Sequence, residues 1–502
     1  MYLLGVDVGT THCKAGLFAA DGGALRLASR PTATRQTASG RSFYDPDELW
    51  ATVAAAIGEA TGAVDPARIA VAGLTSMAES GLLVDHATGA PRSEVIPWFD
   101  LASTPQAARI ARDAASLERF QRTGLRPSFK FGLAKLLWIR DRDPEAHRGA
   151  VWLSVADYIA YRLTGNMATD YSLAARTFAF RIDTRSWDED WIRFWDFDPA
   201  LFPPARPSGD VIGNVHAVAG AVTGLAPGTP VAIGGHDHLC AAVAVGAHRP
   251  PVVFDSMGTA ESLLGTLPGQ ELGAAEFESG LSYGRHVAGD RYYWLGGLAS
   301  AGGSIEWLRR QLAEPPLHYE QIQALLHDAG EGATGILYFP YLSGSGTPWT
   351  DPTAQAAFVG LRAAHRRADL LKAVLEGTAF EIEAIRRAGE QVTGATIDRV
   401  VAVGGGTRIA PWMQIKADVS GCRYDTVSME EAAVLGAAMI AGAGCGLFTD
   451  VEEAGAALAR HPTTTVLPDE GRRATYRRLY EQGYLPLQAP LRRYYSCMAA
   501  QE

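Results

Sequence analysis

Cysteine is scarce in this sequence. Five of the 502 residues are cysteines, and no two of them are spaced as Cys-x-x-Cys. An odd number of separated cysteines in a chain of this length argues against the disulfide framework that is typical of small secreted domains. We therefore expect a reducing compartment. The five residues are Cys13, Cys240, Cys422, Cys445 and Cys497.

The sequence also lacks a long hydrophobic segment. Its N-terminus enters Met-Tyr-Leu-Leu-Gly-Val-Asp-Val-Gly-Thr directly, with no basic stretch before an apolar one, so we expect no signal peptide. The longest run of small apolar residues, 432–448, is rich in glycine and alanine and too short to span a bilayer. These two features predict a cytoplasmic protein without a membrane segment.

There is no excess of positive charge. The chain has 45 Lys and Arg residues against 55 Asp and Glu residues, which gives a formal net charge of −10. Nothing therefore indicates a surface for nucleic acid or anionic membranes, and an anionic ligand would need a local site and a metal ion. A hydrophobic content of 47% is typical of soluble globular proteins, and the length allows two or more domains.

Two common nucleotide-binding motifs are missing as well. Neither G-x-x-x-x-G-K-[ST] nor G-x-G-x-x-G occurs at a strand-to-helix junction. The chain instead has short glycine turns at 9–11 and 258–259, whose backbone N–H groups and hydroxyls can surround a phosphate. Asp7 precedes the first turn and is placed to hold Mg²⁺ through water. A third glycine cluster, 404–406, suits either a bound ligand or a tight strand-to-helix turn.

Strand patterns recur in the two halves of the chain. An apolar strand, a turn with Asp and Gly-Thr, and a second strand appear near the N-terminus and return with the turn at 255–259. This similarity predicts two domains of one architecture, divided near Pro250-Pro251 into 1–249 and 250–490. The repeated strands are expected at 2–8, 14–18, 24–30 and 68–73, and again at 252–254, 262–267 and 399–404.

Amphipathic patterns between the strands predict helices. One covers 45–60, with Asp45 as its N-cap, Pro46 in the first turn and Glu48 completing a capping box. Another covers 369–388. Strands that alternate with helices predict an α/β fold in both halves.

The stretch Gly-Gly-His-Asp-His, residues 234–238, lies between an apolar strand and a helix of small residues. Asp237 suits a catalytic base at the end of a buried strand, a helix N-cap, or a ligand in a metal site. In an extended chain His236 and His238 face away from Asp237, and in a helix they point about 200° apart. We therefore do not expect the three side chains to share one ion, and the base and the N-cap stay open.

The sequence resembles a known family, the FGGY carbohydrate kinases, which share their fold with actin, hexokinase and the heat-shock chaperone ATPases. The resemblance runs from Tyr2 to about Phe448. Its most specific part is AAFVGL at 356–361, followed after seven residues by DLLKAVLE at 369–376. Further matches are Lys135–Trp138, Asp157–Tyr158, Leu163–Gly165, Thr169–Asp170, Ser172, Gly405, Glu430–Ala433 and Leu435–Ala438.

The resemblance implies an α/β fold of two actin/hexokinase-like (ribonuclease H-like) domains flanking a central cleft. It implies transfer of the γ-phosphoryl group of ATP to a hydroxyl of a small sugar, either a ketose such as a pentulose or hexulose or a polyol. Asp237 matches the catalytic aspartate, which favours the general base, and Asp7 matches the Mg²⁺ position. The expected nucleotide-binding residues are Thr10, Thr11, His12, Lys14, Gly258, Thr259, Gly302, Glu306, Gly404, Gly405 and Ile409. The expected sugar-binding residues are Glu79, Trp98, Asp100, Lys130, His236 and His238.

Departures from the family pattern lie in the sugar pocket. Ala78 and Ala102 stand where glycerol kinases carry arginines, and Ser345-Gly346 replaces Glu-Arg, so glycerol is not the expected substrate. Glu79 replaces the histidine of xylulokinases, which leaves D-xylulose open. Lys130 stands where glycerol kinases place a tyrosine and is either a solvated lysine at the pocket rim or a group that selects an acidic or more hydroxylated sugar.

Two other functions fit parts of the sequence. One is a non-catalytic sugar- or nucleotide-binding member of the same fold that acts by domain closure. The other is an NAD-dependent enzyme using 404–406, which lacks the required glycine spacing. The expected partners are a small-molecule sugar and ATP, with no nucleic acid and no membrane, and a homodimer is left open. The sequence identifies neither the sugar, nor its phosphorylated hydroxyl, nor a role for the tail at 491–502.

Overall fold

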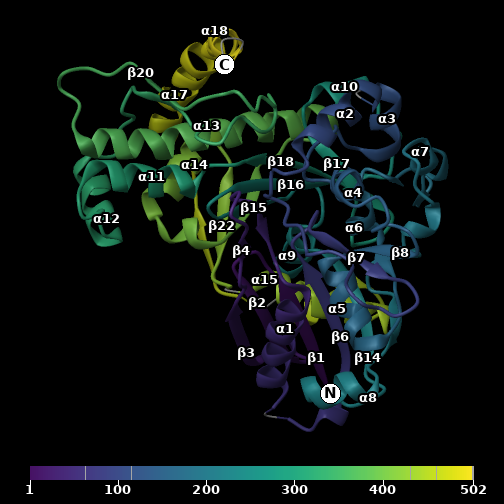
Figure 1. Ribbon diagram of the computed structural model, residues 1–502. Helices are drawn as coiled ribbons and strands as arrows, with labels where there is room; N and C mark the ends of the chain where they lie inside the picture. Colours follow the sequence, from purple (N-terminus) through teal and green to yellow (C-terminus); the bar gives the residue numbers. More distant parts are fainter. Residues whose placement is uncertain (63, 115, 430, 459–460, 500–502) are drawn as a thin grey trace.

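Two β-sheets, one from each half of the chain, form the centre of the computed structural model (Figure 1). The structure describes residues 1–62, 64–114, 116–429, 431–458 and 461–499. Glu430, one of the residues that match the family, and residues 500–502 of the tail lie outside this description. The N-terminal sheet occupies the lower lobe of Figure 1. The upper lobe contains helices α13 (Arg367–Thr393), α14 (Ala410–Ser420), α17 (Glu470–Leu479) and α18 (Leu485–Ala499).

The N-terminal sheet has the strand order β13-β14-β6-β1-β2-β3. Strands β1, β2 and β3 form an antiparallel meander, whereas β6 and β14 run parallel to β1. The strands expected at 2–8, 14–18, 24–30 and 68–73 all form here. The bounds are β1 (Tyr2–Val8), β2 (His12–Ala19), β3 (Ala24–Pro31), β6 (Ile69–Ser76), β13 (Val211–Asn214) and β14 (Pro230–His236).

The C-terminal sheet repeats this topology in the order β17-β18-β16-β15-β21-β22-β23. Strands β15, β16 and β18 are the antiparallel meander, and β21 and β22 are the parallel strands. The predicted duplication is therefore present in the fold. The bounds are β15 (Val253–Met257), β16 (Glu261–Pro268), β17 (Ser282–Arg285), β18 (Arg291–Leu298), β21 (Arg399–Val403), β22 (Arg423–Val427) and β23 (Thr463–Val466).

One predicted turn is too long. The pattern indicated a turn at 255–259, but β15 continues to Met257 and the turn comprises only 258–260. The buried carboxylate of Asp255 is the reason, because the Nζ of Lys416 lies 3.3 Å from its Oδ2 and also contacts Glu261. With a buried cation beside it, Asp255 can remain in the strand rather than turn towards water.

The two predicted helices form with small differences at their ends. Helix α1 (Pro46–Thr61) begins after Asp45, whose carboxylate accepts from the N–H groups of Asp47 and Glu48. The expected capping box is not completed, because the Glu48 carboxylate pairs with Arg35 at 2.9 Å. Helix α13 (Arg367–Thr393) is longer than expected and is buried over most of its circumference.

Helices α9 (Asp237–Ala244) and α15 (Ala432–Gly444) cross each other between the two sheets. Helix α15, from the C-terminal half, lies on β1 and β6 of the N-terminal sheet. Glycines permit this approach, because a Cβ on Gly5 would lie 1.9 Å from the carbonyl oxygen of Val434, and one on Gly73 2.1 Å from that of Ala437. Helix α9 shares a hydrophobic cluster with Phe254 of β15. Each half of the chain thus contributes a helix to the junction.

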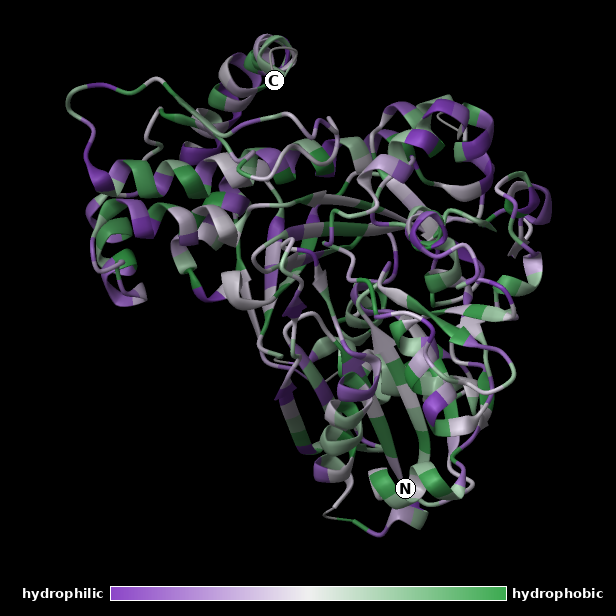
Figure 2. Cartoon of the chain, viewed as in Figure 1, coloured by the Kyte–Doolittle hydropathy of each residue, from purple (hydrophilic) through white to green (hydrophobic). Residues whose placement is uncertain are grey.

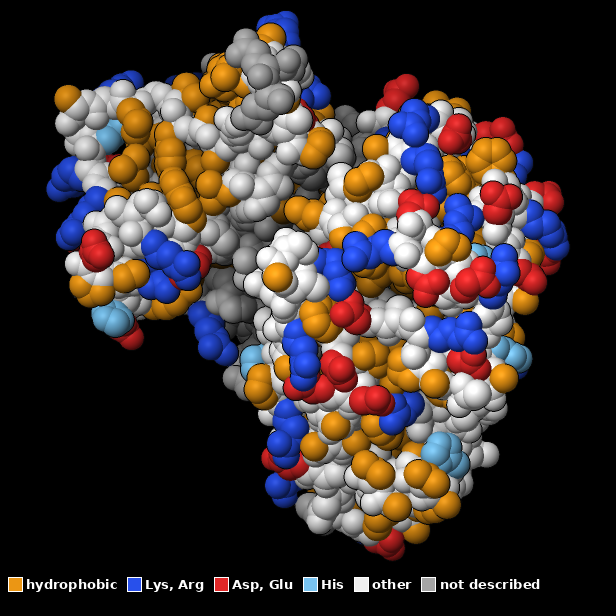
Figure 3. All heavy atoms as spheres, viewed as in Figure 1, with side chains coloured by type: hydrophobic (Ala, Val, Ile, Leu, Met, Phe, Trp, Pro, Cys, Tyr) orange, Lys and Arg blue, Asp and Glu red, His pale blue; other side chains and the backbone are white. Residues whose placement is uncertain are grey.

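Hydrophobic residues follow the strands and the inner faces of the helices (Figure 2). On the face shown in Figure 3, Lys and Arg side chains lie beside Asp and Glu rather than in a patch of one sign. Among the described residues no helix combines the length and apolarity needed to cross a membrane.

The other elements surround the two sheets. The remaining helices are α2 (Thr104–Ala114), α3 (Leu117–Thr123), α4 (Gly132–Arg142), α5 (Val155–Thr164), α6 (Tyr171–Ala175), α7 (Glu189–Phe194), α8 (Ala217–Thr223), α10 (Ala274–Glu278), α11 (Gly302–Leu312), α12 (Tyr319–Asp328), α14 (Ala410–Ser420), α16 (Val451–Leu458), α17 (Glu470–Leu479) and α18 (Leu485–Ala499). The short strands are β4 (Arg35–Gln36), β5 (Ser42–Phe43), β7 (Gly81–Asp85), β8 (Ala150–Ser154), β9 (Thr169–Asp170), β10 (Phe180–Arg181), β11 (Ser186–Trp187), β12 (Ala205–Arg206), β19 (Leu337–Phe339) and β20 (Ala357–Val359).

Candidate functional site

A cleft of about 640 Å³ lies between the halves of the chain. Asp7, Lys14 and Asp237 line it from the N-terminal half, and Gly404 and Gly405 line it from the C-terminal half. The cleft therefore brings together the expected base, the expected Mg²⁺ ligand and three of the expected nucleotide-binding residues.

Asp237 is placed by the junction between β14 and α9. Gly235 has φ +112°, a conformation that side chains strongly disfavour, and a Cβ there would lie 2.5 Å from the Ser172 Oγ. The same hydroxyl accepts from the N–H of His236 at 3.0 Å, which fixes the end of the strand. Asp237 then begins α9, so its carboxylate lies at a helix N-terminus, where the helix dipole stabilises negative charge.

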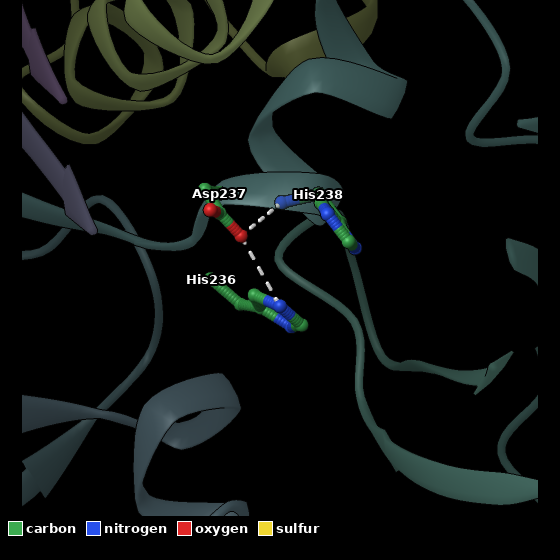
Figure 4. Close-up of side chains that lie close together, drawn as sticks. All are labelled: His236, Asp237 and His238. Atoms are coloured by element: carbon green, nitrogen blue, oxygen red, sulfur yellow. Dashed lines mark hydrogen bonds and ion pairs between the residues drawn. The ribbon is translucent and has the colours of Figure 1, made fainter. Parts of the chain in front are cut away.

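One oxygen of Asp237 makes both of its contacts (Figure 4). Oδ1 accepts from the N–H of His238 at 2.7 Å and lies 3.2 Å from Nε2 of His236. Within the described part of the chain, no donor reaches Oδ2. This arrangement holds the carboxylate in one orientation and leaves its second oxygen available to a ligand in the cleft.

Neither arrangement expected for a regular strand or a regular helix is present, because the two histidines lie together and His236 also contacts Asp237. Their rings stack with centroids 5.2 Å apart and planes inclined by 25° (Figure 4). His236 ends a strand and His238 lies in the first turn of a helix, so neither the strand nor the helix period applies across the pair. One ligand atom from each of His236, Asp237 and His238 lies within 4.8 Å of the others.

The charges in the cleft shift the pKa values of its acids in opposite directions. Burial raises the pKa of Asp237, but His238 and the hydrogen-bonded His236 outweigh it and hold the pKa below its usual value. Burial and the neighbouring Asp237 carboxylate raise the pKa of Asp7 to about 8. Burial also lowers the pKa of His238. The carboxylate of Asp237 is thus the one that stays ionised at neutral pH.

Asp7 has an unsatisfied oxygen. Its Oδ1 is buried and has no hydrogen-bond partner among the described residues. Ionising this buried group beside a second carboxylate at neutral pH requires a nearby cation, and carboxylate oxygens are the ligands that Mg²⁺ prefers. The residues present therefore fit a magnesium ion at Asp7. Lys14 nearby pairs across the cleft with Glu431 at 2.8 Å.

The first glycine turn has a different environment from the one expected. The hydroxyl of Thr10 accepts from the indole Nε1–H of Trp98 at 3.0 Å, which joins an expected nucleotide residue to an expected sugar residue. Thr11 and His12 are exposed, and the carbonyl of His12 accepts from the N–H of Gly9 at 3.0 Å. None of these three side chains lines the cleft described above.

The second turn supports a helix. The carbonyl of Gly258 accepts from the N–H of Gly302 at 3.2 Å, and the carbonyl of Thr259 accepts from those of Ala301 and Gly303 at 3.0 Å. A Cβ on Gly302 would lie 2.5 Å from the Gly258 oxygen, so close packing alone explains that glycine. On α11, Glu306 pairs with Arg309 and Arg310 rather than pointing alone into the cleft.

The third glycine cluster opens onto the cleft. Gly404 has φ +99° and lies against the carbonyl of Met257, whereas a Cβ on Gly405 would meet no atom within 4 Å. This open space is what close approach of a flat or phosphorylated ligand requires. Ile409 is buried at the start of α14 and contributes to the core beneath the turn.

Glu79 is held by a residue that the sequence analysis missed. Nε of Arg176 donates to Oε1 of Glu79 at 2.7 Å, and both side chains are nearly buried. Burial alone would raise the pKa of Glu79, but Arg176 lowers it below the usual value. Arg176 also lies 3.4 Å from the hydroxyl of Tyr293 in the C-terminal half. An arginine within the apolar run SLAARTFAF was the available signal, because a buried cation requires a partner.

The remaining expected sugar residues differ in their freedom to bind. The ammonium of Lys130 lies 5.3 Å from the centre of the Trp98 ring, and burial lowers its pKa while Glu79 opposes that effect. Lys130 is therefore not a freely solvated lysine. The carboxylate of Asp100 is already occupied, because Oδ2 accepts from the N–H of Ser42 at 2.8 Å and Oδ1 from that of Ala102 at 3.0 Å.

Comparison with known proteins matches nearly the whole chain to the family that the sequence resembles. The family model "FGGY family of carbohydrate kinases, N-terminal domain" matches residues 2–244, and the C-terminal domain of the same family matches 256–445. A xylulose kinase of Bacillus subtilis is 30% identical over 462 residues, which are 90% of each chain. A glycerol kinase of Citrifermentans bemidjiense is 31% identical over 462 residues, covering 89% of this chain and 91% of that protein. The crystal structure of a xylulose kinase from Rhodospirillum rubrum superimposes with a TM-score of 0.89, at 27% identity, over 99% of this chain and all of that chain.

The duplicated sheets, the interlobe cleft and the family matches lead to one conclusion. The fold is the α/β, two-domain actin/hexokinase-like architecture expected from the sequence. The chain belongs to the FGGY family of carbohydrate kinases.

Proposed function

We propose that the protein transfers the γ-phosphoryl group of ATP to a hydroxyl of a ketose or polyol, with Asp237 as the general base. The observation that carries this proposal is the orientation of the Asp237 carboxylate. Its Oδ1 is fixed by His236 and His238, while Oδ2 remains available on the wall of the cleft.

The proposed base has the geometry and charge that its role needs. A general base must reach the proton of the substrate hydroxyl while ionised, and Asp237 keeps a pKa below its usual value despite burial. The transition state of phosphoryl transfer is loose, so holding the acceptor oxygen in line contributes more than basicity alone. His236 and His238 flank the carboxylate and are placed to contact the sugar.

The proposed phosphate site lies on both walls of the cleft. Lys14 supplies positive charge from the N-terminal half, and the open space at Gly405 admits the nucleotide from the C-terminal half. We propose that Asp7 holds Mg²⁺, which neutralises charge on the phosphates when bound. Closure of the two halves, 1–249 and 250–490, would exclude water and so limit ATP hydrolysis.

The sugar pocket is proposed around Glu79, Trp98 and Lys130. The Glu79 carboxylate is fixed by Arg176, Trp98 offers an aromatic face, and Lys130 lies over that face. Asp100 is proposed to shape this pocket through its backbone contacts rather than through a free carboxylate. The xylulose kinase and glycerol kinase relatives support the class of acceptor, and the replacements at Ala78 and Ala102 argue against glycerol.

The decisive experiment measures ADP release with Mg-ATP across ketoses, aldoses, polyols and sugar acids. Asp237→Asn keeps the shape of the side chain but cannot accept a proton, so kcat is expected to fall about 10²- to 10⁴-fold with ATP binding retained. Asp183→Asn, an exposed residue outside the cleft, is the matched control and should keep full activity. A sugar-dependent rate that survives in Asp237→Asn would contradict the assignment of the base. Binding of Mg-ATP without any sugar-dependent rate would instead favour a non-catalytic binding protein.

A further inference from the structure

His236, Asp237 and His238 together have the ligands of a transition-metal site. One ligand atom from each residue lies within 4.8 Å of the other two. The Nδ1 atoms of both histidines are buried and have no hydrogen-bond partner among the described residues. His236 is only 4% exposed, and the nitrogen that faces Asp237 is its Nε2, so Nε2 is the atom of this ring that would bind an ion.

The distances suit a small tetrahedral ion. Zinc binds imidazole nitrogen and carboxylate oxygen at about 2.0–2.2 Å, which places neighbouring ligand atoms about 3.3–3.6 Å apart in a tetrahedral site. The Nε2 of His236 and the Oδ1 of Asp237 are already 3.2 Å apart. The ligand atom of His238 lies within 4.8 Å of the other two, so its ring must move closer to reach the same ion, and no hydrogen bond to its Nδ1 opposes this.

The donor set distinguishes this site from that of Mg²⁺. Two imidazoles and one carboxylate suit Zn²⁺, Co²⁺ or Cu²⁺, whereas Mg²⁺ prefers oxygen ligands alone. Asp237 and His238 line the cleft, so a bound ion would have an open position facing the substrate. Three protein ligands and one open position are the coordination typical of accessible zinc sites.

We propose that His236, Asp237 and His238 bind a divalent transition-metal ion of the zinc type, and that this ion inhibits phosphoryl transfer. An ion on Oδ1 would withdraw charge from the carboxylate that is needed to accept the hydroxyl proton. It would also occupy the space beside Oδ2 where the sugar hydroxyl must lie. The inhibitory part of the proposal rests on the proposed role of Asp237, but the binding part does not.

The binding experiment uses Co²⁺, whose visible absorption intensifies in tetrahedral coordination. It is done in excess Mg²⁺ and in the Cys497→Ser background, because Cys497 is the exposed thiol. We expect one equivalent of Co²⁺ to give an intense visible band that Zn²⁺ abolishes. Loss of a residue that only orients a metal ligand weakens affinity about 10- to 100-fold, so His238→Gln should weaken Co²⁺ binding by at least about tenfold.

The matched control is His327→Gln, which removes an almost fully exposed imidazole on α12. It should leave the Co²⁺ band unchanged. His236→Gln is the second test variant should His238→Gln fail to fold, as judged by circular dichroism. Absence of a tetrahedral band in the parent protein, or a band that persists in the folded glutamine variants, would overturn the site.

The inhibition experiment measures ADP release against Zn²⁺ at saturating Mg²⁺, with each variant normalised to its own zinc-free rate. The concentration of Zn²⁺ for half inhibition should rise at least about tenfold in His238→Gln, in parallel with the loss of Co²⁺ affinity. A Co²⁺ band together with a zinc-insensitive rate would overturn the inhibitory role. Failure of the proposed kinase reaction would appear differently, as a protein with the Co²⁺ band but no sugar-dependent ADP release.

Discussion

At the scale of single residues, the ion pair of Glu79 and Arg176 organises the proposed sugar pocket. Glu79 has φ +61°, which is unusual for a residue with a side chain, and its carboxylate accepts from the Nε of Arg176 at 2.7 Å. Backbone strain of this kind persists only where surrounding contacts enforce it. The Nζ of Lys135 adds such a contact, because it donates to the carbonyl oxygen of Glu79. Glu79 is therefore fixed through both its backbone and its side chain.

Removing one partner of this pair should be costly. Arg176→Met leaves the buried carboxylate of Glu79 unpaired, so we expect a loss of about 3–5 kcal/mol in the free energy of unfolding, measured in urea. The double variant Glu79→Gln with Arg176→Met has no unpaired charge and should recover part of this loss. Equal losses in the single and the double variant would show that packing, rather than charge, accounts for the effect.

Lys130 gives a prediction about substrate binding. Its ammonium lies over the Trp98 ring and makes no ion pair within the described residues, so it is available to an anionic or hydroxyl-rich sugar. Lys130→Met should raise KM for the true substrate by at least about tenfold, because hydrogen bonds to a charged group are among the stronger ones. The kcat and the KM for ATP should stay unchanged, since Lys130 does not line the cleft that contains Asp237 and Gly405. An unchanged sugar KM would remove the lysine from the specificity site.

The residue scale also shows how far the sequence alone could lead. The resemblance to the family predicted Asp237 as the base and Asp7 as the Mg²⁺ ligand, and both residues lie in the same cleft. The placement of His236 and His238 relative to Asp237 was mispredicted because 236–238 span a strand end and a helix start, where no single period applies. Arg176 was missed because its partner Glu79 lies 97 positions away, and a charge pair at that separation leaves no local pattern.

At the scale of elements, α13 places three buried carboxyl groups in the C-terminal core. Glu376, Glu381 and Glu383 are each 1% exposed. The Oε2 of Glu381 accepts from the hydroxyls of Tyr341 at 3.1 Å and Tyr484 at 2.5 Å. Burial raises the pKa of Glu381 to about 7, and the tyrosine hydrogen bonds only partly oppose it. The sequence predicted the start of this helix but not its buried acids, because its apolar face gave no sign that the other faces are covered.

The raised pKa predicts the pH dependence of stability. The pKa of Glu381 is about 7 in the folded state against 4.5 for the free side chain, so the folded protein retains the proton longer. The contribution of this group is therefore full below pH 4.5 and is lost as the pH rises to about 7. Glu381→Gln cannot ionise and keeps its tyrosine contacts. We expect wild type and variant to be similar in stability at pH 4.5 and the variant to be more stable by about 2–3 kcal/mol at pH 8.

The measurement is urea unfolding of both proteins at intervals between pH 4.5 and 8. Their difference isolates Glu381 from the other groups that titrate in this range. A difference that stays constant with pH would contradict a raised pKa for Glu381. A variant that is less stable at every pH would show that the carboxylate is needed for its contacts.

At the scale of the whole molecule, the two halves are joined by the packing of helix α15 rather than by a linker alone. The repeated strands and the family matches at 2–244 and 256–445 separate the sheets cleanly. Helix α15 nevertheless comes from the second half and covers the sheet of the first. Sequence patterns predicted the duplication, since each strand has a local signature. They did not predict that α15 packs on the N-terminal sheet. Because α15 is buried on all sides, its hydrophobic pattern does not indicate which sheet it contacts.

The crossing of α9 and α15 depends on one glycine. A Cβ on Gly436 would lie 1.8 Å from the carbonyl oxygen of Cys240, which is closer than any real contact. Both helices begin at the cleft, since Asp237 is the first residue of α9 and Ala432 the first residue of α15. Separating the helices would therefore move the proposed base relative to the nucleotide wall.

Gly436→Ala tests this crossing against a matched substitution. Alanine favours a helix over glycine by about 1 kcal/mol, so at Gly455 of α16, where the added Cβ would have its nearest neighbour at 3.6 Å, the change should stabilise the protein. At Gly436 the same change should instead destabilise it by about 1–3 kcal/mol, because the helices must move apart. The kcat for sugar phosphorylation should fall in Gly436→Ala and remain unchanged in Gly455→Ala. If both variants gained stability and kept their activity, the close crossing of α9 and α15 would not be what fixes the two walls of the cleft relative to each other.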